Sequence, residues 1–195
     1  MPIYSLLSLK GGVGKTTSTM HLAACSQEAG AKTTVIDADD ERSAMRWASF
    51  AALPFDVVAG ERDRLAQQAR ALEATGETVL IDTPPNNREI LSRAAMVSSS
   101  VIVPLIPTGL DVDRMMPTLE LLRDVEASRG SLDVAILLNR WDGRKRLAQE
   151  ALDALAAYPI LGAKVRALTR YEQAFGSVPT DLEEYRAVWQ EITHG

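Results

Sequence analysis

Lys10-Gly11-Gly12-Val13-Gly14-Lys15-Thr16-Thr17 is the stretch that decides the fold of this chain. It follows the apolar run Ile3 to Leu9 and opens a segment of helical pattern that ends near Gly30. A strand, a glycine-rich loop and a helix in this order form the context of a phosphate-binding loop, because glycines let backbone N–H groups turn inward at a helix N-terminus. We expect Lys15 to reach the outer phosphates and Thr16 to bind Mg²⁺. The residues expected around the nucleotide phosphates are Lys10, Gly11, Gly12, Val13, Gly14, Lys15, Thr16 and Thr17.

The composition is that of an ordinary globular protein. Of the 195 residues, 46% are hydrophobic and 24% are charged, and the net charge is −5. This length favours a single domain over residues 1–195 with a sizeable core. No apolar run is long enough for a membrane span, and Met1-Pro2-Ile3 leads into a strand rather than a signal peptide, so we expect a cytoplasmic location. The single cysteine, Cys25, excludes an internal disulfide framework.

Short apolar runs alternate with helical segments along the chain, without repeats or low-complexity tracts. Strands are expected at Ile3 to Leu9, Thr33 to Ile36, Phe55 to Val58, Thr78 to Ile81, Val101 to Leu105, Val134 to Leu138 and Val165 to Leu168. Helices are expected from the glycine loop to Gly30 and at Glu41 to Leu53, Arg62 to Ala74, Arg88 to Val97, Asp113 to Ala127, Arg144 to Ala157 and Leu182 to Ile192. Strands that are apolar on both faces and separated by helices predict an α/β fold with a doubly wound, mainly parallel sheet covered by helices on both faces.

Polar residues follow several of the expected strands. Right-handed crossovers place the carboxyl ends of parallel strands along one edge, where ligands bind. The sequence therefore predicts that the phosphate loop, Asp37, Asp39, Asp82 and Asn139 meet at this edge. Asp82 ends a hydrophobic strand, which is the form of a Walker B acid that holds Mg²⁺ through water.

The form K-G-G-x-G-K-T-T departs from the general phosphate loop, because Leu9 stands where the first glycine belongs and Lys10 follows it. This form resembles the deviant Walker A motif of the ParA/MinD family of P-loop ATPases. Asp82-Thr83-Pro84-Pro85 is similar to the D-T-P-P of ParA-like proteins, and Arg170 to Gly176 loosely resembles a segment common in compact partition ATPases. The resemblance extends from Ile3 to about Phe175 and fits the small ParA-like subgroup, which lacks an N-terminal DNA-reading extension.

This resemblance implies roles for single residues. Lys10 would reach across an ATP-sandwich dimer to the partner's ATP, as an arginine finger does, and Lys10, Lys15 and Asp39 would be the catalytic residues. Asp39 would position the attacking water, and Asp37 would lie nearer the metal, so that the Mg²⁺ residues are Thr16, Asp37 and Asp82. Asp40-Glu41 replaces the usual Pro-Gln of the family, and the acidic run also fits a solvated loop and helix N-cap. Asn139 stands where family members often contact adenine, although a turn residue fits there too.

A basic strip lies within the otherwise acidic chain. Residues 139–170 carry seven Lys or Arg against three Asp or Glu, which is typical of a polyanion contact and also of a solvated helix face. The candidate DNA-contacting residues are Arg140, Arg144, Lys145, Arg146, Lys164, Arg166 and Arg170.

The resemblance implies an ATPase that is slow without its partner and that positions a plasmid, a chromosome region or another large cargo. Its cofactors would be ATP and Mg²⁺. Its partners would be a second copy of the chain, non-specific DNA of the nucleoid and a cargo-bound protein that stimulates hydrolysis, with no membrane contact. Two alternatives are a metabolic enzyme of the dethiobiotin-synthetase type and a MinD-like membrane-cycling regulator, which the acidic segment Asp181 to His194 disfavours. A nitrogenase-reductase-like iron–sulfur ATPase needs more cysteines than Cys25.

Overall fold

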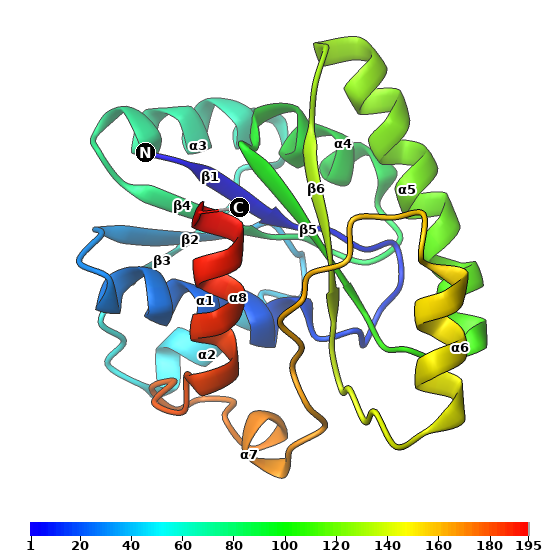
Figure 1. Cartoon of the computed structure of the whole chain (residues 1–195). Coiled ribbons are helices and arrows are strands. Elements are labelled where there is room, and N and C mark those ends of the chain that lie inside the picture. The colour runs from blue at the N-terminus through cyan, green and yellow to red at the C-terminus, as the bar shows by residue number, and fades with distance from the viewer. Residues whose placement is uncertain (195) are drawn as a thin grey trace.

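The computed structural model describes residues 1–194, and at residues 109 and 110 it describes the backbone only. Its centre is a six-stranded sheet in the order β3-β2-β4-β1-β5-β6 in which every neighbouring pair is parallel (Figure 1). The strands are β1 (Ile3–Leu6), β2 (Thr33–Asp37), β3 (Asp56–Ala59), β4 (Thr78–Asp82), β5 (Ser100–Leu105) and β6 (Asp133–Leu138). The doubly wound parallel sheet predicted from the sequence is therefore confirmed.

Helices cover the sheet on both faces (Figure 1). The helices are α1 (Lys15–Glu28), α2 (Ser43–Phe50), α3 (Leu65–Ala74), α4 (Arg88–Val97), α5 (Gly109–Arg129), α6 (Arg146–Ala154), α7 (Thr169–Glu172) and α8 (Glu183–His194), and a 3-10 turn, η1, covers Arg62–Arg64. One buried cluster joins the sheet to α3, α4, α5 and α6, and a second joins it to α1, α2 and α8. The strands β1, β2, β4 and β5 are buried along their whole length, as their continuous apolar runs require, whereas the edge strand β3 is partly exposed.

The strand register aligns the carboxyl ends that the sequence singles out. Asp37 at the end of β2 is paired with Asp82 at the end of β4, and Asp82 is also paired with Leu6 of β1. Because β1 leads directly into the glycine loop, the loop and both aspartates lie at one edge of the sheet.

The expected strand at Val165 to Leu168 is wrong. Only an isolated bridge joins Trp141 to Arg166, next to the point where the chain turns at Arg140 with φ 51°. The segment then forms the short helix α7, which the sequence pattern did not predict. Its Tyr171 is buried against His21 of α1 and Tyr185 of α8, with ring centroids 5.3 Å from each. Backbone hydrogen bonds of Val165 with Leu138 and Trp141 hold the start of this segment beside β6, and the aromatic packing of Tyr171 holds α7.

Among the described residues, no helix combines the length and the hydropathy needed to cross a bilayer.

Candidate functional site

The glycine loop has the backbone conformation that its composition predicts. Gly12 and Gly14 have φ angles of 75° and 91°, a left-handed conformation that side chains disfavour. A Cβ atom on Gly14 would also lie 2.8 Å from the Asn139 amide nitrogen. Helix α1 begins at Lys15, so the loop leads directly into a helix N-terminus, where backbone N–H groups attract an anion.

The Lys15 ammonium lies inside the loop with only neutral hydrogen-bond partners. The residue is 7% exposed, and its Nζ donates to the carbonyl oxygens of Ser8 at 3.3 Å and Lys10 at 3.2 Å. Burial lowers the pKa of Lys15, whereas the charges of Asp82 and Asp39 oppose this shift. A buried cation without an ion pair is costly, so a bound phosphate would stabilise it.

Lys10, the second lysine of the motif, forms an ion pair with Asp111 of its own chain. Asp111 lies in the first turn of α5 and is 6% exposed. The sequence did not single out Asp111 as a partner of Lys10, and its position just after β5, at the carboxyl edge of the sheet, is the only signal that points to it. Lys10 must leave Asp111 before it can reach another copy.

Asp82 has the environment expected of a residue that faces Mg²⁺. It is 1% exposed, and the Thr16 hydroxyl donates to its Oδ2 at 2.6 Å. Burial raises the pKa of Asp82 to about 7, and the Asp37 carboxylate adds to the rise while the hydrogen bond from Thr16 opposes it. A buried carboxylate next to a hydroxyl is a hard oxygen donor set, which fits Mg²⁺. The structure thus brings Thr16 and Asp82 together, and their role at Mg²⁺ stays a prediction.

Asp37 lies nearby, but its oxygens have other partners. Oδ1 accepts a hydrogen bond from the Asp39 amide at 3.1 Å, and Oδ2 accepts one from the Met45 amide at 2.9 Å. Burial raises the pKa of Asp37, and these two hydrogen bonds oppose the rise. Asp37 thus holds the loop that carries Asp39, and its role as a metal ligand stays a prediction. Among residues 1–194, no group of three His, Cys, Asp or Glu side chains forms a metal site, so a bound Mg²⁺ would depend on phosphates and water as well.

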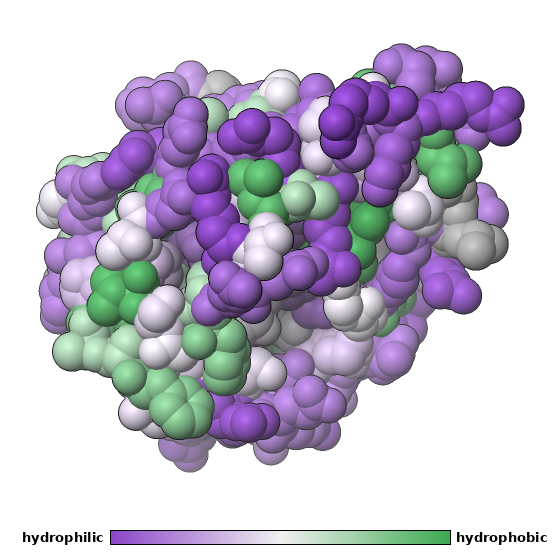
Figure 2. Space-filling model, turned by 90° about the horizontal axis from the view of Figure 1, so that it is seen from below, coloured by the Kyte–Doolittle hydropathy of each residue, from purple (hydrophilic) through white to green (hydrophobic). Residues whose placement is uncertain are grey.

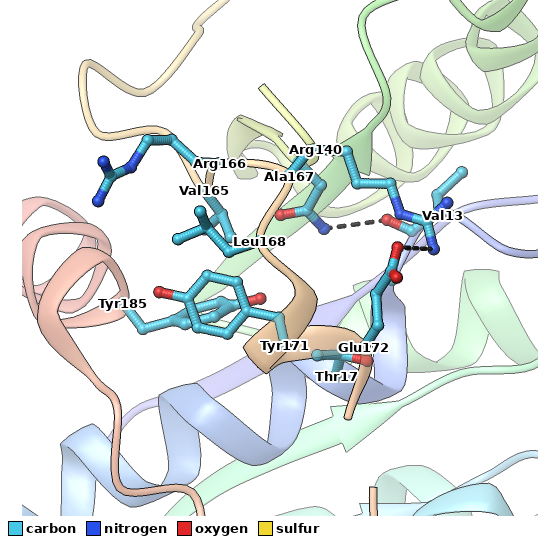
Figure 3. Close-up of a pocket in the computed structure, with 12 residues that line it drawn as sticks. Val13, Thr17, Arg140, Val165, Arg166, Ala167, Leu168, Tyr171, Glu172 and Tyr185 are labelled. Carbon is cyan, nitrogen blue, oxygen red and sulfur yellow. Dashed lines mark hydrogen bonds and ion pairs between the residues drawn. The ribbon is translucent and has the colours of Figure 1, made fainter. Parts of the chain in front are cut away.

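Asn139 lines a hollow next to the phosphate loop (Figure 3). Its amide nitrogen donates to the Val13 carbonyl at 2.9 Å and to the Ser18 hydroxyl at 3.1 Å. Its Oδ1 is buried and accepts no hydrogen bond from any described residue. This acceptor can receive a hydrogen bond from the exocyclic amine of adenine. The sequence did not predict the walls of this hollow, which include Val165, Leu168, Tyr171 and Tyr185.

The basic strip is largely neutralised by carboxylates of the same chain. Arg140 pairs with Glu172 at 3.5 Å across the mouth of the hollow next to Asn139 (Figure 3), and Arg140 also borders the phosphate loop. The other ion pairs are Arg144 with Asp142, Arg146 with Glu150, Arg166 with Glu184, and Arg170 with Asp181. Lys164 lies over the Trp141 ring at 5.1 Å, and Lys145 is exposed. The structure thus places Arg140 at the hollow next to Asn139 rather than on a separate cationic surface.

The fold and the loop define a P-loop nucleotide-binding protein. Residues 4–177 match the family described as "CobQ/CobB/MinD/ParA nucleotide binding domain", and the chain belongs to this family. A "Maintenance of carboxysome distribution protein A" of Gloeobacter kilaueensis is 33% identical over 181 residues, which cover 88% of this chain and 80% of that protein.

Two solved structures share the fold. Apo McdA from Cyanothece has a TM-score of 0.78 and 18% identity, and the match covers 99% of this chain and 98% of that one. The septum site-determining protein MinD from Pyrococcus horikoshii, complexed with Mg-ADP, has a TM-score of 0.75 and 18% identity, and the match covers 99% and 96% of the two chains. The expected relationship to the ParA/MinD group is confirmed.

Proposed function

We propose that this chain is an ATP-driven positioning ATPase that uses ATP and Mg²⁺. The observation that carries the proposal is the two-lysine phosphate loop, in which Lys15 is buried with neutral partners only and Lys10 lies at the rim. In this proposal Lys15 and Thr16 hold the phosphates and metal, Asp82 orients the hydrated Mg²⁺, and Asp39 positions the attacking water. The relatives that carry positioning or partition names support this class of function.

ATP binding would bring two chains together, with Lys10 of each reaching the phosphates of the other. A cation supplied from a partner stabilises charge on the transferring phosphate, so hydrolysis would be slow in the separate chain and faster when a cargo-bound protein orders the dimer. Hydrolysis would then return Lys10 to Asp111 and separate the copies.

Lys10→Ala is expected to abolish dimer formation while ATP binding persists. The measurement is molar mass by light scattering after size exclusion, with ADP or with AMPPNP and Mg²⁺, for wild type and variant. Lys145→Ala is the matched control, because Lys145 is an exposed lysine for which the structure gives no ion pair with a described residue. If the molar mass of wild type is the same with ADP and with AMPPNP, the proposal that Lys10 acts on the ATP of a second copy is contradicted. The alternative, a metabolic enzyme of the dethiobiotin-synthetase type, is then favoured.

The DNA part of the proposal needs a separate test, because five of the seven strip residues already have carboxylate partners. We expect wild type with AMPPNP and Mg²⁺ to retard a non-specific duplex at low salt and to release it as salt rises, since phosphate contacts displace counterions. Lys145→Glu with Lys164→Glu should weaken this retardation. An absence of retardation at the lowest salt, with the dimer formed, would remove DNA from the proposed function.

A further inference from the structure

A cleft lined by cations lies beside Lys10, outside the hollow next to Asn139. It has a volume of about 620 Å³ and lies between the phosphate loop, the start of α4 and the first turns of α5. Three cations line it, namely Lys10, Arg88 and Arg114, together with Asn86 and Pro117. Lys10 is held by Asp111, whereas Arg88 and Arg114 are exposed and form no ion pair with any described residue. What sets these two arginines apart is their place beside Lys10 in one cleft.

The cleft is large and open, and its lining combines the three cations with Leu9 and Pro117, which fits a protein segment better than a small ion. Figure 2 views the molecule from the side on which α2 and α7 lie in Figure 1, and this side is mostly hydrophilic with one larger apolar area at the lower left. The cations Lys10, Arg88 and Arg114 would bind an acidic partner through charge complementarity.

The chain itself carries an acidic group that fits. The phosphate loop lines a hollow of its own, the phosphate hollow, to which Gly11, Lys15 and Asp39 contribute. Glu41 borders this phosphate hollow. It is exposed and forms no ion pair with a described residue, whereas its neighbour Asp40 pairs with Arg62 at 2.5 Å. Glu41 also belongs to the acidic pair Asp40-Glu41, which stands where the resemblance to the ParA/MinD family leads us to expect Pro-Gln.

Two-fold symmetry connects these two features. If Lys10 of one copy reaches the phosphates of the other, as the proposed function requires, then the cleft next to Lys10 faces the rim of the partner's phosphate hollow. The exposed carboxylate on that rim is Glu41. In an isologous dimer each contact occurs twice, so both clefts receive an acid at the same time.

We propose that Arg88 and Arg114 of one copy form an ion pair with Glu41 of the second copy in the ATP-bound dimer. This contact rests on the proposed function and adds a chain-specific determinant of self-association. A partner chain without an acid at this position would leave both arginines uncompensated, which disfavours mixed dimers.

The test is a charge exchange followed by light scattering with AMPPNP and Mg²⁺. Arg88→Glu with Arg114→Glu in one chain, and Glu41→Arg in another, should each weaken homodimerisation at least about tenfold, because like charges then face each other twice. An equimolar mixture of the two variants should restore the dimer, since every contact in the mixed pair has opposite charges. Arg70→Glu is the matched control, because Arg70 is an exposed arginine on α3 that forms no ion pair with a described residue.

The outcomes are separable. A wild type that stays monomeric with AMPPNP overturns the proposed function and this inference together. A wild type that dimerises, with variants that dimerise equally well, overturns only the inference. Variants that are monomeric alone and also monomeric when mixed overturn it as well, because the loss then does not come from the stated pairing. A restored mixed dimer that weakens as salt rises supports it.

Discussion

Lys15→Ala is expected to lower the ATP hydrolysis rate by at least about 100-fold, because it removes the one cation that the loop holds inside the phosphate site. In the structure its Nζ has only the Ser8 and Lys10 carbonyl oxygens as partners, and the residue is 7% exposed. Two other cations near the loop already have carboxylate partners, because Lys10 is paired with Asp111 and Arg140 with Glu172. The measurements are the steady-state rate of phosphate release and the affinity for a fluorescent ATP analogue.

The same variant separates catalysis from folding. Burial lowers the pKa of Lys15, so the empty loop is destabilised by this ammonium, and its removal should leave the melting temperature of the nucleotide-free protein unchanged or raised. ATP should then raise the melting temperature of wild type but not of Lys15→Ala. A variant that melts well below wild type without nucleotide would show that Lys15 is structural, and its loss of activity would then carry no catalytic meaning.

The sequence predicts the phosphate loop and the acids because both depend on local pattern and on parallel register. Gly12 and Gly14 indicate backbone in the left-handed conformation, and Asp37 and Asp82 lie at the ends of paired strands. The ion pair of Lys10, the second lysine of the motif, depends on tertiary structure and not on local sequence. Lys10 and Asp111 are 101 positions apart, and only the packing of α5 against the sheet brings them together.

The wall next to Asn139 was beyond prediction for a similar reason. Residues 165–172 form neither a strand of the sheet nor a long helix, so they carry little periodicity. Their position comes from Tyr171, whose ring packs on His21 and Tyr185. The pairing of the basic strip with acids also depends on how this segment lies, since Glu172 meets Arg140, and Asp181 and Glu184 meet Arg170 and Arg166.

Asp82→Asn is expected to have opposite effects on stability and activity. The pKa of Asp82 rises from its ordinary value of 3.8 to about 7 in the folded protein, chiefly through burial. The folded protein therefore binds a proton that the unfolded chain releases between about pH 4 and 7, and the contribution of this group to stability falls as pH rises through that window and stays low above it. The difference corresponds to roughly 4 kcal/mol at pH 8.

Asparagine resembles the protonated acid and still accepts the hydrogen bond from Thr16, so the nucleotide-free variant should melt about 8–16 °C above wild type at pH 8 and close to wild type near pH 4. Its Mg²⁺-dependent hydrolysis should fall at least about 100-fold, because a neutral amide holds the hydrated metal far less strongly than a carboxylate. Asp63→Asn, which neutralises a side chain that is 89% exposed, should change neither property. A stability gain that is as large near pH 4 as at pH 8 would contradict the proton linkage, and full Mg²⁺-dependent activity would contradict the assignment of Asp82 to the metal. The gain in stability arises because the Asp82 carboxylate is buried, so that its charge destabilises the nucleotide-free protein until metal and phosphates bind. Such a cost is typical of a site that is selected for binding its ligand rather than for the stability of the empty fold.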